Sequence, residues 1–155
     1  MPTGLKASSS VVAIGFSATE SAQNTFTQTS VDLNLSPLDR EVFVVLSVNL
    51  DPATPDLGAT DAFVETSLCT TSQTAVSNLA NSNCLASSNN VIRAGAVTAV
   101  SFQTLGMETP PTNLDYVGII ATNDFFVQVQ GTGNTSVKSV SGKLYGYRAR
   151  ASADI

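Results

Sequence analysis

The stretch 114–150 reads LDYVGIIATNDFFVQVQGTGNTSVKSVSGKLYGYRAR, and it decides the fold class. Residues 116–121 form an apolar run, and residues 125–130 alternate between apolar and polar side chains, which is typical of a strand with one buried face. The segment 131–134, GTGN, follows, and glycines supply the positive φ angles of a tight turn. Because residues 137–147 continue the strand pattern, we predict three neighbouring strands joined as a meander, with a hairpin at 131–134.

The rest of the chain carries the same kind of signal. The run 41–50, EVFVVLSVNL, is apolar on both faces and predicts a strand in the middle of a sheet. Residues 51–61 contain two prolines and a glycine and predict a surface loop. Residues 70–90 are rich in Ser, Thr and Asn and predict mostly loop, with a single helical turn capped by Thr74 or Ser77. Further strands are expected at 10–16, 26–35, 62–69, 91–93 and 95–105, with a break at 107–112.

Length and strand count together predict one domain. The chain has 155 residues, of which 43% are hydrophobic, enough for a single core. Eight or nine short strands with hardly any helical periodicity predict an all-β, single-domain antiparallel β-sandwich that is jelly-roll-like. Residues 1–9 are too small and polar to form an element alone and are expected to be an N-terminal arm, which leaves residues 10–155 as the sandwich domain.

Charge is scarce and unevenly placed. Only 12% of the residues are charged, the net charge is −5, and Ser and Thr make up roughly a quarter of the chain. An ordinary soluble monomer relies on more surface charge to resist association, so this composition favours a protein covered by copies of itself. The acidic residues gather before Glu65, whereas basic residues prevail near the end of the chain. We expect acidic loops of one copy to meet the basic residues of another copy, namely Lys138, Lys143, Arg148 and Arg150.

Two groups of residues are candidates for a covalent or a metal site. A bond between Cys69 and Cys84 would pin the loop between them and stabilise the fold by about 3 kcal/mol. Two free thiols are the alternative, because the cytosol keeps thiols reduced. Asp51, Asp56 and Asp61 offer carboxylate oxygens of the kind that calcium prefers, but their spacing matches no calcium loop and a plain acidic turn explains them better.

Groups that transfer protons are few. The chain has no His, which removes the commonest general base and the commonest transition-metal ligand. Nothing in the sequence pairs two carboxylates for hydrolysis. We therefore expect a protein that is not an enzyme and needs no cofactor. A net negative chain without a Lys/Arg cluster is also not expected to bind nucleic acid directly.

These observations favour a structural, self-assembling subunit, most plausibly a coat, capsid or decoration protein of a virion. Copies of the chain, in a symmetric or helical assembly with or without other shell proteins, are then its expected partners. No run of about 18 apolar residues predicts a membrane span, and no secretion signal stands out. We expect synthesis in the cytoplasm and a final place in a virion or extracellular assembly. A carbohydrate-binding or adhesin module of similar fold is the first alternative, and a small hydrolase is the second.

Overall fold

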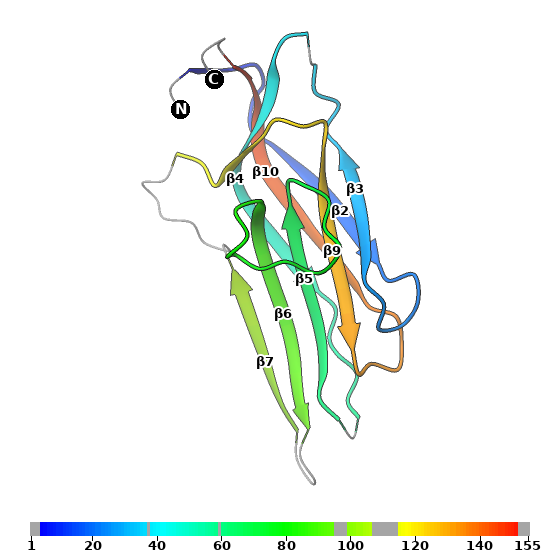
Figure 1. Cartoon of the computed structure of the whole chain (residues 1–155). Coiled ribbons are helices and arrows are strands. Elements are labelled where there is room, and N and C mark those ends of the chain that lie inside the picture. The colour runs from blue at the N-terminus through cyan, green and yellow to red at the C-terminus, as the bar shows by residue number, and fades with distance from the viewer. Residues whose placement is uncertain (1–3, 37, 59, 95–98, 107–114, 152–155) are drawn as a thin grey trace.

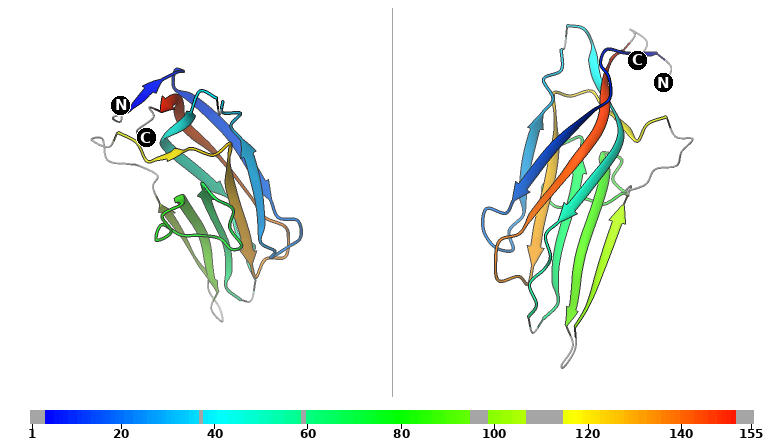
Figure 2. Two further views of the ribbon diagram at one scale, coloured as in Figure 1. Left: turned by 45° about the horizontal axis from the view of Figure 1, so that its top comes forward. Right: turned by 180° about the vertical axis from the view of Figure 1, so that it is seen from behind.

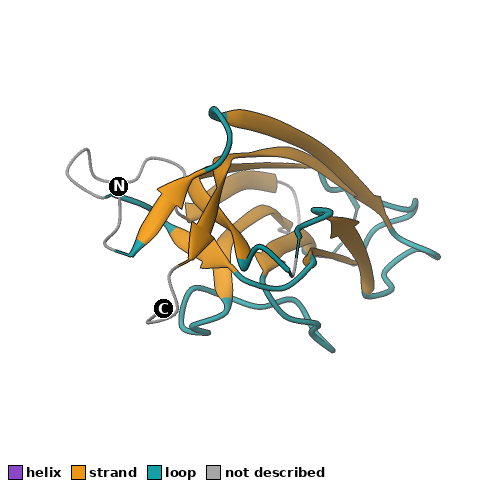
Figure 3. Ribbon diagram, turned by 90° about the horizontal axis from the view of Figure 1, so that it is seen from above, coloured by secondary structure: helices purple, strands orange, loops and turns teal. Residues whose placement is uncertain are grey.

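Two antiparallel sheets face each other across an apolar core in the computed structural model of the chain (Figures 1 and 3). The structure describes residues 4–36, 38–58, 60–94, 99–106 and 115–151, and the regular elements within them are all strands. The first sheet contains β1 (Leu5–Ala7), β2 (Val12–Thr19), β4 (Glu41–Pro52), β8 (Gly118–Ile120) and β10 (Ser139–Ala151). The second sheet contains β3 (Thr27–Asp32), β5 (Ala62–Cys69), β6 (Cys84–Ala94), β7 (Ala99–Gly106) and β9 (Asp124–Thr132).

Four antiparallel pairs define the topology: β2 with β10, β3 with β9, β4 with β8, and β5 with β6. These four pairs follow one another along a single long antiparallel hairpin, which turns at the β5–β6 connection. The hairpin is folded over on itself, so that β10 pairs with β4 as well as with β2, and β9 pairs with β5 as well as with β3. Two sheets built in this way form a jelly roll. The predicted antiparallel sandwich is therefore confirmed, with ten strands in the described part of the chain where eight or nine were predicted.

The three strands of the stretch 114–150 are not neighbours. β8 and β10 lie in the first sheet with β4 between them, and β9 lies in the second sheet. The predicted meander with a hairpin at 131–134 is therefore wrong. Gly133 has a positive φ of 71°, as a turn requires, but the chain there crosses from one sheet to the other (Figure 1). Alternation shows which face of a strand is buried, and it does not show which strand lies alongside.

β4 lies inside the first sheet, as predicted, but it is covered on both faces only over residues 42–45 and not over the whole predicted run 41–50, because Asn49 is exposed on the outer face. Phe43 and Val45 point into the core between the sheets. Val42 and Val44 join a second apolar cluster with Leu5, from β1, and with a residue of β10. Each fully buried side chain of this size contributes about 1.5–3 kcal/mol to folding.

Other predicted boundaries need correction. Within the segment 1–9, predicted as an arm, Leu5–Ala7 pairs with the end of β10, so the described part of that segment lies against the sandwich. β6 begins at Cys84, inside the stretch 70–90 that was predicted to be mostly loop, because its Ser and Asn side chains give no apolar period. Residues 70–83 contain no helical turn. The break predicted at 107–112 and residues 95–98 lie outside the described residues.

Two glycines on paired strands provide a test of the close contact between β10 and β4. A Cβ atom on Gly146 would collide with the Val44 carbonyl oxygen and would lie 2.6 Å from a ring carbon of Phe43. A Cβ atom on Gly15, in the neighbouring β2, would meet nothing within 4 Å. We expect Gly146→Ala to lower the free energy of unfolding by about 1–3 kcal/mol, and Gly15→Ala to change it by no more than about 0.5 kcal/mol. Urea denaturation measures both, and equal effects would contradict the pairing described here.

Candidate functional site

Asp56 joins the β4–β5 connection to the β9–β10 connection at one end of the sandwich. Its Oδ1 accepts a hydrogen bond from Lys138 Nζ at 2.7 Å, and its Oδ2 accepts one from the Ser136 hydroxyl at 2.8 Å and one from the Thr135 backbone N–H at 3.0 Å. Because of these contacts, first that from Lys138 and then that from Ser136, the pKa of Asp56 lies well below its usual range. Lys138 is only 8% exposed. An ammonium group so buried needs a partner, so Lys138, predicted to contact another copy, is used within the chain.

Glu20 and Asn134 complete this end of the sandwich, and the sequence analysis did not single out either of them. Glu20 is 4% exposed, and its carboxylate accepts three backbone N–H hydrogen bonds at 2.7–2.9 Å, from Thr25, Gly131 and Lys138. The Asn134 amide donates to the Phe63 carbonyl oxygen and accepts from the Asp56 backbone N–H, both at 2.9 Å. We call Glu20, Asp56, Asn134 and Lys138 the polar end cluster. Its hydrogen-bonding groups are engaged with one another and with the backbone, so the cluster ties loops together.

The three aspartates considered for a metal site serve separate contacts. Asp61 accepts hydrogen bonds from the Ala94 backbone N–H and from the Arg93 guanidinium, each at 2.9 Å, and these two bonds, in that order, lower its pKa. Asp56 belongs to the polar end cluster, and Asp51 is exposed near the end of β4. Among the described residues, no three His, Cys, Asp or Glu side chains are placed to share a metal ion. The structure therefore does not bring Asp51, Asp56 and Asp61 together.

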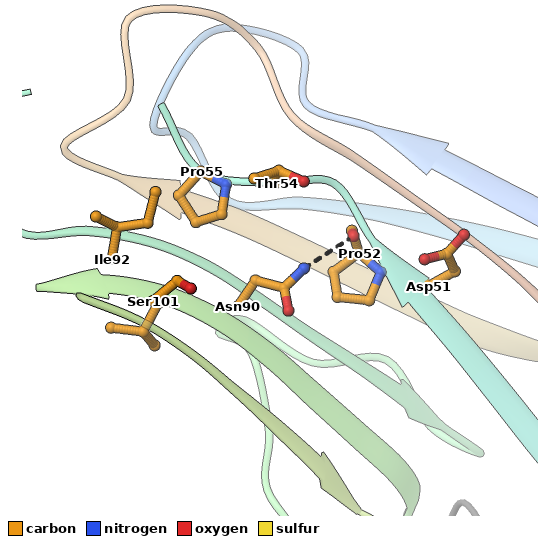
Figure 4. A pocket seen from close by; sticks show the side chains of 8 residues that line it. Asp51, Pro52, Thr54, Pro55, Asn90, Ile92 and Ser101 are labelled. Carbon is orange, nitrogen blue, oxygen red and sulfur yellow. Dashed lines mark hydrogen bonds between the residues drawn. The ribbon is translucent and has the colours of Figure 1, made fainter. Parts of the chain in front are cut away.

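A cavity of about 520 Å³ opens between the end of β4 and the strands β6 and β7 (Figure 4). Asn90, on β6, donates a hydrogen bond to the Pro52 carbonyl oxygen at 3.1 Å and so links the two sheets there. The lining residues are Asp51, Pro52, Thr54, Pro55, Asn90, Val91, Ile92 and Ser101. Of these only Asp51 is ionisable, so this lining offers a single carboxylate and not the pair that glycoside hydrolysis uses.

A shallow groove of about 300 Å³ lies on the outer face of the first sheet. Its lining residues are Asn49, Asp51, Ser141, Gly142, Lys143 and Tyr145. Strand register places Lys143 between Gly15 of β2 and Asn49 of β4, so neither of its neighbours across the strands carries a charge. Lys143 is exposed and forms no ion pair with another described residue. Of the four basic residues predicted to contact another copy, it is the one that the described chain leaves unpaired.

The two arginines near the end of β10 bind within the chain. Arg148 donates hydrogen bonds to the carbonyl oxygens of residues 33 and 34, at 2.6 and 3.0 Å, and to Glu41 at 3.3 Å. These bonds hold the chain that leaves β3 against β10. Arg150 lies 3.9 Å from Asp39, and both side chains are more than half exposed. An exposed pair at this distance contributes little to stability, so Arg150 keeps some freedom to meet other partners.

Cys69 and Cys84 face each other across β5 and β6, and both are buried free thiols. The hydrogen bond between the two thiols raises the pKa of Cys69, and burial raises it further. The same hydrogen bond lowers the pKa of Cys84, because the Cys69 thiol can donate to the Cys84 sulfur. Residues 70–83, which the pair encloses, pass in front of the second sheet (Figure 1). The pair is thus placed where a bond would close that loop.

We expect Asp56→Asn to weaken the acid sensitivity of the fold. The Asp56 carboxyl ionises more readily in the folded chain than at its ordinary pKa of 3.8, so its stabilising effect is complete above that pKa and disappears as the pH falls below it. The free energy of unfolding should therefore fall more steeply in the wild type than in Asp56→Asn between about pH 4 and pH 2. Lys138→Met, which removes the largest cause of the shift, should flatten the profile too. Parallel profiles for wild type and Asp56→Asn would contradict this assignment.

We expect a disulfide oxidant such as oxidised glutathione to join Cys69 to Cys84 within one chain. The two cysteine sulfurs would lose two protons and two electrons, and the oxidant would leave as two thiols. The bond should raise the free energy of unfolding by about 3 kcal/mol. Mass spectrometry after alkylation without reductant checks the bond, with Cys69→Ser as the variant that cannot form it. Retention of two alkylated thiols in the oxidant-treated, folded protein would contradict the expectation.

Comparisons with known proteins add little to this geometry. No protein-family model matches the chain, and no curated protein matches it. Among solved structures, a chain described as Desmodium yellow mottle tymovirus is similar to it, with 15% sequence identity and a TM-score of 0.34. The similarity spans 92% of this chain and 87% of that one. A likeness of this size does not support a function.

Proposed function

We propose that this chain is a structural subunit that assembles with copies of itself, as a coat, capsid or decoration protein of a virus particle. The jelly roll serves viral capsids, but it also serves lectins and cupins. The fold alone therefore does not choose among these functions. The residues on the surface of the fold have to distinguish among these functions.

The main support for the proposal is that most Lys and Arg side chains form ion pairs within the chain. Four of the seven Lys and Arg residues form ion pairs within the described chain, namely Arg93, Lys138, Arg148 and Arg150. These pairs leave few positive side chains free on a surface where charge is already scarce. Copies of the chain can therefore come into contact while burying few charged groups, whose desolvation opposes association.

Apolar side chains at one end of the sandwich add a second argument. Leu57 is 70% exposed and Val137 is 49% exposed. They directly follow Asp56 and precede Lys138 in the sequence, so they lie at the end held by the polar end cluster. Interfaces between subunits typically have an apolar centre, poor in charged residues, with a polar rim around it. This end is suited to contact with a neighbouring subunit.

The expected partners are copies of the same chain, with or without other shell proteins. Direct contact with nucleic acid is not part of the proposal, because binding to phosphates needs unpaired Lys and Arg side chains. Within the described chain these are only Lys6, Arg40 and Lys143, and they lie on different strands and loops. The described residues contain no helix with the length and apolarity needed to cross a bilayer.

Light scattering coupled to size-exclusion chromatography tests the proposal, with electron microscopy of the same untagged protein. We expect the mass to grow with protein concentration toward a closed shell, ring or tube that microscopy makes visible. A chain that remains monomeric from micromolar to millimolar concentration, across low and high salt, would contradict self-assembly.

The groove on the first sheet favours one other function, that of a carbohydrate-binding module. Tyr145 offers a ring with a polar tip, and Asn49, Asp51 and Lys143 offer donors and acceptors beside it. Groups of these kinds can bind sugar hydroxyls and the apolar face of a sugar ring. A stable monomer that loses glycan binding on Tyr145→Ala would favour this function over assembly.

A further inference from the structure

β7 lies outside the eight-stranded jelly roll. It pairs with β6 and with no other described strand, so its outer edge carries backbone N–H and C=O groups without a partner in the described chain. Figure 1 and the right view of Figure 2 show the molecule from opposite sides, and in both of them no strand of the first sheet lies over β7. Within the described residues, the sandwich is therefore open along β7.

The opposite side of the sandwich is different. There β3 is the edge strand of the second sheet, and it packs beside β2 of the first sheet, so the two layers meet. β3 also ends in Asp32, a charged residue of the kind that discourages pairing at an edge. β8, at one edge of the first sheet, has only three residues. Among these three edge strands, β7 is the one that is both long and not covered by a strand of the other sheet.

The sequence of β7 lacks the usual protection of an edge strand. Its eight residues, AVSFQTLG, include no charged residue and no proline. Its pairing with β6 runs from Ala94 opposite Ala99 to Ser87 opposite Gly106 without a bulge. Natural proteins place Lys, Pro or a bulge on a long exposed edge to prevent edge-to-edge pairing. β7 has none of these, and it carries an apolar side chain, Val100, that is 54% exposed.

Charge near this edge does not oppose a second copy. Arg93, the register neighbour of Val100 on β6, is paired with Asp61 at 2.9 Å. The guanidinium also lies over the ring of Phe63, 5.6 Å from its centroid. The positive charge of Arg93 beside β7 is thus already compensated within its own chain.

We propose that the outer edge of β7 pairs with the same edge of a second copy, as an antiparallel contact with two-fold symmetry. The inference rests on the proposed self-assembly and names the surface and the partner for it. A strand paired with its own copy is self-complementary, because each chain donates and accepts the same backbone hydrogen bonds. Eight residues span about 26 Å and supply about eight such bonds. The two second sheets then form one continuous sheet across the pair.

Val100→Lys tests this contact, with Ser30→Lys as the matched control. Both residues are exposed and both lie on edge strands of the second sheet, so the two variants change net charge equally. A lysine on β7 replaces an exposed apolar side chain at the paired edge by a charged group, which discourages pairing between edges, whereas a lysine on β3 lies away from the proposed contact. We expect Val100→Lys to need a roughly tenfold higher concentration for association, and Ser30→Lys to associate like the wild type in light scattering.

Amide hydrogen exchange on the wild-type protein gives a second measurement that needs no variant. Exchange of residues 99–106 should slow as the concentration is raised through the association range, while exchange of residues 27–32 should not. If the wild type associates but Val100→Lys associates equally well and β7 exchange stays constant, the β7 contact is wrong and self-assembly stands. If the wild type does not associate at all, both proposals are overturned.

Discussion

The pairing of β10 with β4 is the contact on which the rest of the fold depends. The two strands run side by side from Val140 opposite Pro52 to Arg150 opposite Glu41. They approach so closely that a Cβ on Gly142 would collide with the Asn49 carbonyl oxygen. The opposite edge of β10 pairs with β2 and then with β1, so β10 pairs with three other strands of the first sheet. Without the pairing of β10 with β4, β1 and β2 would not be joined to β4 and β8 in the first sheet.

The core joins the second sheet to that layer. Phe16, on β2, meets Phe125, on β9, edge to face with ring centroids 5.7 Å apart. Phe43 and Leu144 from the first sheet and Leu68 from the second are fully buried in the same cluster. Aromatic contacts of this geometry contribute about 0.5–1.5 kcal/mol beyond the area that they bury. The core is thus made by residues distant in sequence, which the jelly-roll crossings bring together.

Polar groups at the ends of the sandwich hold its connections together. The polar end cluster fastens three connections, and Arg148 fastens the chain that follows β3. Buried charges and amides must find partners, because leaving one unpaired costs about 1–3 kcal/mol. In a chain with so few charges, pairing several of them within the chain leaves a surface on which hydroxyls, amides and small apolar groups prevail. In the proposed assembly, this surface and the β7 edge contact neighbouring copies.

Local pattern was enough to determine the all-β class, the sandwich and the central place of β4, because alternation and apolar runs report directly on which faces are buried. The sequence also showed the low charge from which assembly was inferred. Only the tertiary structure decided which strands pair, and it placed β8, β9 and β10 apart where the pattern predicted neighbours. It likewise decided that Lys138 and Arg148 bind inside the chain, and that Glu20 accepts three backbone N–H groups. Apart from the bond between Thr25 and Glu20, these contacts join residues 82 to 118 positions apart, and no local period encodes them.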